Sequence, residues 1–193
     1  MPASAQSIDS SNHTFSLDLE GIKKRAREHI EEGAVTESYQ GDRQTILKLL
    51  NDSLATELVC VLRYRNHHFM SASVGGIAGF AVTDELMEHS KEEQEHADRL
   101  AERITQLGGE PDFSPKSLST RSHTDYVISD SLRGMLTEDL VAERIAIETY
   151  GSIIRYIGDK DPTTRRLLEQ ILEKEEEHAD ELADFLKRLP LNA

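Results

Sequence analysis

One short acidic segment occurs twice in this chain, and this repeat constrains the fold more than any other feature. The segment is Lys91-Glu92-Glu93-Gln94-Glu95-His96-Ala97-Asp98, and its second copy is Lys174-Glu175-Glu176-Glu177-His178-Ala179-Asp180. When the Glu-x-x-His cores are aligned, both ligand-type side chains recur 82 positions later. Glu and His three residues apart lie on one face of a helix. Each copy can therefore place a carboxylate and an imidazole where they bind the same cation.

The composition narrows the class of protein. The 193 residues suffice for one domain with a substantial core. The net charge of -14 disfavours nucleic acid as the main partner and suits a protein that attracts metal cations. The single cysteine, Cys60, excludes an intramolecular disulfide and fits a reducing cytosol. Since residues 1–10 do not read as a secretory signal and no long apolar run occurs, we expect a cytoplasmic protein without a membrane partner.

Helical patterns cover most of the chain. Residues 1–41 are expected to form a flexible Ser-rich arm, up to residue 18, and a short amphipathic helix over 19–32 that ends at Gly33. Residues 42–189 contain four long helical patterns, and 190–193 form a tail. The fourth pattern begins with Asp161 as N-cap and Pro162 at the first helical position. The predicted helices cover about 42–70, 80–107, 129–157 and 162–189, with residues 71–79 as the first connection.

The connection between the second and third long helices is longer than the other connections. It has about 20 residues and includes Pro111 and Pro115. A helix of about 28 residues is roughly 42 Å long, whereas about 20 extended residues reach roughly 65 Å. This connection can therefore return along the whole bundle. No convincing strand pattern occurs. We predict an all-α four-helix bundle with one long crossover between helices two and three, plus a short N-terminal helix.

Two pairs of apolar stripes carry charged residues at matching positions. The first and third helices share the order Leu, Leu, Glu, β-branched residue, Tyr, with every pair 86 positions apart. The second and fourth share Leu, Glu, His, Leu. The chain therefore resembles an internal duplication of a helix pair. The stripes are Leu50, Leu54, Glu57, Val61 and Tyr64; Leu136, Leu140, Glu143, Ile147 and Tyr150; Leu86, Glu93, His96 and Leu100; and Leu168, Glu175, His178 and Leu182.

These stripes predict a site for two metal ions. Four carboxylates that face one core cannot all ionise unpaired, because each buried charge costs several kcal/mol. Their charges balance two divalent cations, and two neutral imidazoles complete the ligand set. Carboxylate with imidazole suits iron, manganese or zinc, and the absence of thiolate argues against a structural zinc site. The candidate catalytic and metal-binding residues are Glu57, Glu93, His96, Glu143, Glu175 and His178.

This set of six residues resembles the di-iron centre of the ferritin-like superfamily, in its bacterioferritin-like and Dps-like mini-ferritin branch. The resemblance covers about residues 42–188. It implies two irons per subunit, Fe(II) oxidation by dioxygen or hydrogen peroxide, and storage of ferric iron in a hollow homo-oligomeric shell that protects against oxidative stress. The implied roles are Glu93 and Glu175 as bridges, Glu57 and His96 on one ion, and Glu143 and His178 on the other.

Three departures from that family pattern refine the expectation. Bacterioferritins bind haem through a Met directly after the bridging Glu of helix two, and here that position is Gln94, so we expect no haem. Only 15 residues follow His178, which leaves no room for the fifth helix of 24-subunit shells and favours a dodecamer. Residues 1–22 contain no Lys or Arg, so DNA binding through such a tail is not expected.

Two rival functions remain open from the sequence. One is a different dimetal redox enzyme on the same scaffold, a manganese catalase or a rubrerythrin-like peroxidase. A rubrerythrin would be expected to carry a Glu three residues after Glu143, where this chain has Ala146, and a Cys-rich iron domain. The other is a DNA-condensing protein that uses the basic residues of the 19–32 segment. The preferred oxidant and the identity of the metal also stay open.

Overall fold

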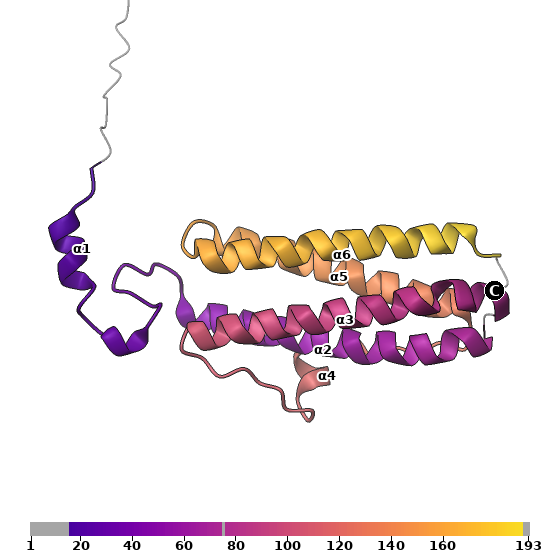
Figure 1. Ribbon diagram of the computed structural model, residues 1–193. Helices are drawn as coiled ribbons and strands as arrows, with labels where there is room; N and C mark the ends of the chain where they lie inside the picture. The colour runs from indigo at the N-terminus through magenta and orange to yellow at the C-terminus, as the bar shows by residue number, and fades with distance from the viewer. Residues whose placement is uncertain (1–15, 75, 191–193) are drawn as a thin grey trace, which may run out of the picture. The chain divides into compact units, whose positions relative to one another are not determined.

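The computed structural model describes residues 16–74 and 76–190, with the backbone alone described at 76–79 and 81. Those residues form helices and loops and contain no strand. Four long helices dominate, namely α2 (Arg43–Val74), α3 (Gly76–Gln106), α5 (Leu132–Ile157) and α6 (Pro162–Arg188). Three short elements accompany them: α1 (Leu19–Arg25), the 3-10 helix η1 (Ile30–Glu32) and α4 (Leu118–Arg121). The predicted helical bundle is confirmed (Figure 1).

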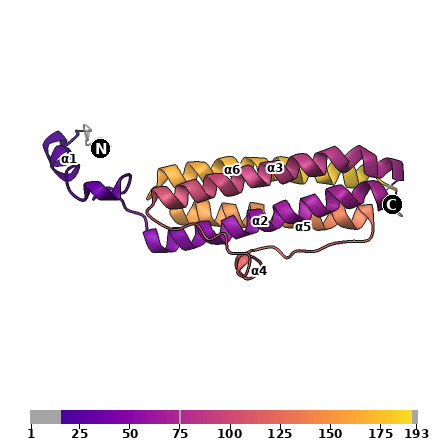
Figure 2. The ribbon, with the colours of Figure 1, turned by 60° about the horizontal axis from the view of Figure 1, so that its bottom comes forward.

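The four long helices are arranged as two antiparallel pairs. α2 packs on α3 and α5 on α6, and further contacts join α2 to α5 and α3 to α6. The segment between α3 and α5, which includes α4, returns along the outside of the bundle. As a result, α3 and α5 run in the same direction (Figure 2). Arg121 holds this crossover against α2, since its Nη1 donates to the Asn51 carbonyl at 2.7 Å. The predicted long crossover is present.

The start of α6 is built by the predicted cap. The Asp161 side chain accepts a hydrogen bond from the Thr164 backbone N–H at 2.9 Å, and Pro162 begins the helix. Arg103 of α3 donates to the same carboxylate at 3.0 Å and thus ties the end of α3 to α6. Ser131 caps α5 in the same way, because its hydroxyl accepts from the Gly134 N–H. α5 therefore begins three residues later than the predicted start at 129.

The connection between the first two long helices is much shorter than predicted. Residues 71–74 continue α2, and α3 begins at Gly76, so the predicted connection over 71–79 was wrong. Ser71 explains part of the difference, because its hydroxyl donates to the His68 carbonyl within the helix and also contacts Thr83 Oγ1 of α3 at 2.9 Å. Packing against a neighbouring helix outweighs the weak helix propensity of Ser and Gly.

Among the described residues, 16–37 and 38–190 belong to separate compact units. The predicted single helix over 19–32 was wrong, since α1 ends at Arg25 and a left-handed residue, His29, precedes η1. Neither element buries a residue. A short amphipathic helix without a packing surface is marginal in water, which accounts for the break. The predicted arm over 1–18 falls largely outside the described residues.

The bundle core follows the predicted stripes. Leu54, Tyr64 and Leu168 are completely buried, and only Leu140 and Ile147 among the stripe residues remain half-buried. Burial therefore reaches the charged members of the stripes as well as the apolar ones. None of the helices in the described part of the chain is long and apolar enough to cross a membrane.

Candidate metal centre

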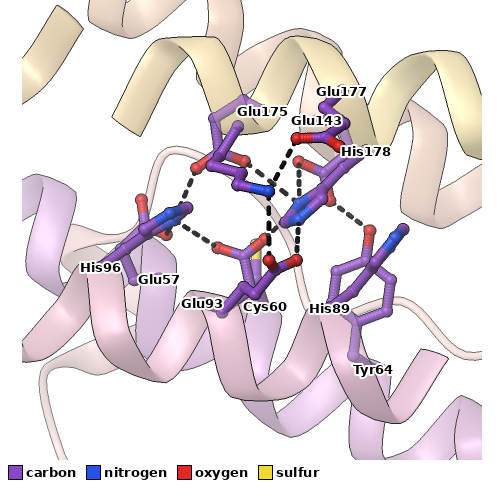
Figure 3. Close-up of polar contacts among 12 residues, drawn as sticks. Glu57, Cys60, Tyr64, His89, Glu93, His96, Glu143, Glu175, Glu177 and His178 are labelled. Atoms are coloured by element: carbon purple, nitrogen blue, oxygen red, sulfur yellow. Dashed lines mark hydrogen bonds and ion pairs between the residues drawn. The ribbon is translucent and has the colours of Figure 1, made fainter. Parts of the chain in front are cut away.

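All six predicted ligand residues meet in the middle of the bundle, and each is at most 3 % exposed. They form two overlapping groups whose potential ligand atoms lie within 4.8 Å of one another. Glu93 and Glu175 belong to both groups, as bridging carboxylates would. Figure 3 shows these side chains pointing toward one another, and they come from α2, α3, α5 and α6. The groups are Glu57, Glu93, His96 and Glu175, and Glu93, Glu143, Glu175 and His178.

The two imidazoles face the carboxylates through the same ring atom. His96 Nδ1 lies 3.0 Å from Glu175 Oε1 and 3.5 Å from Glu57 Oε2. His178 Nδ1 lies 3.3 Å from Glu93 Oε1. Each histidine therefore reaches a carboxylate on another helix, which the spacing within one helix could not show. The helical repeat brings each Glu-x-x-His pair onto one face, and the antiparallel pairing of α3 with α6 makes the two faces meet.

The hydrogen bonding of the cluster is incomplete without a cation. Five buried atoms in it have no hydrogen-bond partner, and each such atom costs about 1–3 kcal/mol. All five are potential metal ligands, and a metal ion would satisfy several of them at once. Oxygen and imidazole nitrogen donors fit iron or manganese. The five atoms are Glu57 Oε2, Glu93 Oε1, His96 Nδ1, Glu175 Oε1 and His178 Nδ1.

The carboxyl groups resist carrying four negative charges together. Burial, helped by the charge of Glu93, raises the pKa of Glu57 to about 8. The same two causes raise the pKa of Glu143 and hold that of Glu175 well above its usual range. Glu93 is the exception: its close contacts with Glu57 and with both histidines outweigh burial and lower its pKa. Without cations, the cluster therefore retains protons and concentrates its negative charge on Glu93.

The two imidazoles bind protons because carboxylates surround them. Burial opposes their charge, but the neighbouring carboxylates of Glu57 and Glu93 raise the pKa of His96 to about 10. Burial likewise opposes the charge of His178, while Glu93 and Glu143 raise its pKa to about 9. Metal coordination needs a free lone pair on the imidazole, so cations and protons compete for the same atoms.

Two tyrosines link the halves of the site crosswise. The Tyr64 hydroxyl of α2 donates to Glu143 of α5, and the Tyr150 hydroxyl of α5 donates to Glu57 of α2. Both tyrosines are buried. Each therefore fixes one oxygen of a carboxylate, and in Glu57 the other oxygen is among the unpartnered atoms.

Two sets of contacts between helices were not predicted from the sequence. Glu92 Oε2 lies 2.7 Å from His178 Nε2, which keeps the proton on that nitrogen and leaves the Nδ1 lone pair for a metal. Asp139 contacts Arg63 Nε at 2.9 Å and His67 Nδ1 at 2.8 Å, and all three are fully buried. The sequence did contain one hint about Glu92. The two copies of the repeat differ at this position, because the second copy has Lys174 there.

A model of the ferritin-like domain matches residues 47–192. The chain belongs to the ferritin-like family. It is 32% identical over 153 residues to the bacterioferritin of Mycobacterium avium, which covers 77% of this chain and 87% of the relative. It is 30% identical over 155 residues to the DNA protection during starvation protein of Pyrococcus furiosus, covering 77% and 80%. At family level these names connect the chain to iron storage and to protection under stress.

Solved structures point the same way. A dodecameric thioferritin, the bacterioferritin-related protein of Bacteroides fragilis, matches with a TM-score of 0.72 and 30% identity over 77% of this chain and 88% of that one. Dps from Thermosynechococcus elongatus matches with a TM-score of 0.69 over 74% and 90%; at 21% identity it shows the fold alone. Because some relatives are named for DNA protection, the expectation that this chain does not bind DNA stays a prediction.

Proposed function

We propose that this chain is a ferroxidase that binds two Fe(II) ions, oxidises them with dioxygen or hydrogen peroxide and stores ferric iron. One observation carries the proposal: five unpartnered, buried ligand atoms converge from two copies of the same helix pair. A packed core does not keep such atoms unless something satisfies them. The predicted ligand set and the roles of its six members are part of this proposal.

The charge of the site supports a pair of divalent ions. Four carboxylates neutralise two such cations, and Glu93 and Glu175 lie where each can contact both. Tyr64 and Tyr150 hold Glu143 and Glu57 in place from the opposite pair of helices. Loading then releases the protons that the metal-free cluster retains, so binding should weaken as the pH falls.

The chemistry needs two irons side by side because dioxygen and hydrogen peroxide are two-electron oxidants. Each Fe(II) gives up one electron; with two protons, dioxygen becomes hydrogen peroxide, or hydrogen peroxide becomes two waters. The buried carboxylates stabilise the added positive charge of Fe(III) without the reorganisation that water would require. The low exposure of all six side chains also excludes bulk solvent from the ions.

The assembly and surroundings are proposed from the same evidence. A match to a dodecameric relative supports self-assembly of this chain into a shell, with twelve subunits as our proposal. A cytoplasmic location, the absence of haem and the lack of DNA binding remain predictions. The named relatives are bacterioferritins and Dps-type proteins, which does not favour a manganese catalase or a rubrerythrin-like peroxidase.

The test is Fe(II) oxidation by the purified, metal-free protein, followed by ferric absorbance after addition of air or peroxide. Glu57→Ala and His178→Ala should each slow the initial rate by about 100-fold or more, since even loss of a ligand's supporting partner costs about 10–100-fold. Glu95→Ala is the matched control, because Glu95 lies on α3 beside the ligands but is exposed. Oxidation at the normal rate in both ligand variants would refute the assignment.

A further inference from the structure

A third group of ligand-type side chains lies outside the six-residue cluster. Glu85 and His89 of α3 and Glu181 of α6 place one atom each within 4.8 Å of one another. His89 Nε2 is 2.9 Å from Glu181 Oε2 and 3.6 Å from Glu85 Oε1. The imidazole is 1 % exposed, whereas the two carboxylates are 37 % and 40 % exposed. The group therefore has a buried nitrogen at its base and two oxygens at its mouth.

A simple structural bridge between helices accounts poorly for this group. One imidazole needs only one carboxylate partner, yet two converge on it, and one oxygen of each carboxylate lies within 4.8 Å of the other. Like charges held together are unfavourable unless a cation or a proton lies between them.

The mouth of the group opens to solvent. A surface pocket of about 160 Å³ is lined by Glu85, Glu181, Asp184, Phe185 and Arg188. Three of these five residues are acidic, and the one cation, Arg188, contacts Asp184 at 3.5 Å. An incoming cation therefore meets the carboxylates of Glu85 and Glu181 before it reaches the imidazole.

The base of the group touches the dimetal cluster. The His89 ring stacks on the ring of His178, with centroids 4.1 Å apart and an angle of 19° between the planes. The Tyr64 ring packs edge-on against the His89 ring, with the ring centroids 5.2 Å apart and an angle of 90° between the planes. Figure 3 shows His89 beside His178 and Tyr64. The third group thus lies between a solvent-facing pocket and one of the proposed ligands.

We propose that Glu85, His89 and Glu181 bind one divalent cation and hold it on its way from solvent to the dimetal cluster. Two carboxylates balance the charge of the ion, and one imidazole adds the nitrogen ligand that favours transition metals over Mg²⁺ or Ca²⁺. The proposal that this group binds an ion does not depend on the ferroxidase function. Its role in supplying the centre rests on the proposed ferroxidase function.

Cobalt(II) is a suitable probe, because it is divalent, prefers the same ligands and gives visible absorption. Metal-free full-chain protein is dialysed against Co(II), and the bound metal per chain is measured. The unaltered chain should bind three equivalents, and the double variant Glu85→Gln with Glu181→Gln should lose one. Asp184→Asn removes a charge from the same pocket without touching the group, and it should still bind three.

The outcomes separate this inference from the proposed function. A chain that carries Glu57→Ala with Glu143→Ala should lose metal from the centre but retain the ion at His89. Binding of a single ion, removed by the Glu85/Glu181 variant, would uphold the third site and sink the ferroxidase proposal. Two equivalents in the unaltered chain, unchanged by that variant, would overturn the third site.

A second measurement does not depend on the folding of any variant. Crystals of the unaltered chain soaked in Co(II) should show anomalous scattering at about 2.1 Å from His89 Nε2, the usual distance between a transition metal and a histidine nitrogen. Scattering at the six-residue cluster alone would refute the third site.

Discussion

The two halves of the internal repeat, α2–α3 and α5–α6, present the same ligands in different surroundings. Each half supplies one lone Glu and one Glu-x-x-His, and each supplies the tyrosine that binds the other half's Glu. Some polar neighbours of these residues do not match, although the apolar ones do. The repeat therefore accounts for the symmetry of the candidate ligand cluster but not for the polar side chains around it.

The divergence is concentrated near one histidine. His178 has Glu92 at its outer nitrogen and His89 stacked on its ring. The position equivalent to Glu92 in the second half is Lys174, and its ammonium group cannot accept a hydrogen bond from His96 Nε2 as the Glu92 carboxylate does from His178. The second histidine is thus held more firmly than the first. We infer that the two metal positions differ in affinity although their nearest ligands are alike.

The largest difference between the halves should appear in stability. Asp139→Ala would leave Arg63 and His67 buried without their shared carboxylate and should destabilise the protein by about 3–5 kcal/mol. Ser53 occupies the equivalent position in the first half, and its buried hydroxyl has no hydrogen-bond partner. Ser53→Ala should therefore change stability by less than about 1 kcal/mol. Urea unfolding of the metal-free protein, at one fixed protein concentration, measures the loss of unfolding free energy in both variants. Equal losses would show that positions 53 and 139 contribute equally to stability.

A smaller effect should appear in metal affinity at one position only. Glu92→Ala removes the partner that orients His178 and should weaken one of the two central metals by about 10–100-fold. Lys174→Ala removes an exposed ion pair with Glu92, worth under about 1 kcal/mol, and should change affinity by less than about 5-fold.

Competitive chelator titrations with Co(II) measure these affinities. Glu92→Gln should recover part of the loss, because its amide oxygen can still accept from His178. Glu88→Ala, an exposed neighbour on α3, is the control. If Glu92→Ala weakened both central metals equally, the proposed difference between the positions would be wrong.

The pH dependence of stability should be shared by both halves. In the metal-free fold the pKa of Glu57 rises from 4.5 to about 8, and those of His96 and His178 rise from 6.5 to about 10 and about 9. The folded chain thus binds more protons than the unfolded chain, so its stability falls as the pH rises from 6 to 9. The lowered pKa of Glu93 acts only below 4.5, outside this range.

Thermal unfolding at pH 6 and pH 9 tests this sign. Each kcal/mol lost should lower the Tm of the metal-free protein by about 2–4 °C. The metal-loaded protein should lose less, because the cations then occupy the places of those protons. A higher Tm at pH 9 than at pH 6 in the metal-free protein would contradict the raised pKa values of Glu57, His96 and His178.

The amino-acid sequence alone determined the four long helices, apart from the ends of α2 and α3 that face each other, and the six candidate ligands. The stripes that contain Glu57 and Glu143 recur at helical spacing, and Asp161 with Pro162 marks the start of α6 by local chemistry. Such signals lie within one or two turns of a helix, so they can be read without knowledge of the fold. The connection at 71–79 was misread because packing between α2 and α3 outweighs the local preference of glycine and serine.

Only the tertiary structure decided which residues of different helices meet, both at the candidate ligands and elsewhere in the core. Glu92 and His178 are 86 positions apart, and Arg63 and Asp139 are 76 apart, so no spacing rule connects them. The same holds for His89 and Glu181, which meet because α3 and α6 pack against each other. Ligands that repeat with the helix are visible in the chain itself. Contacts between helices depend on which faces meet, and that is settled by the packing of the whole core.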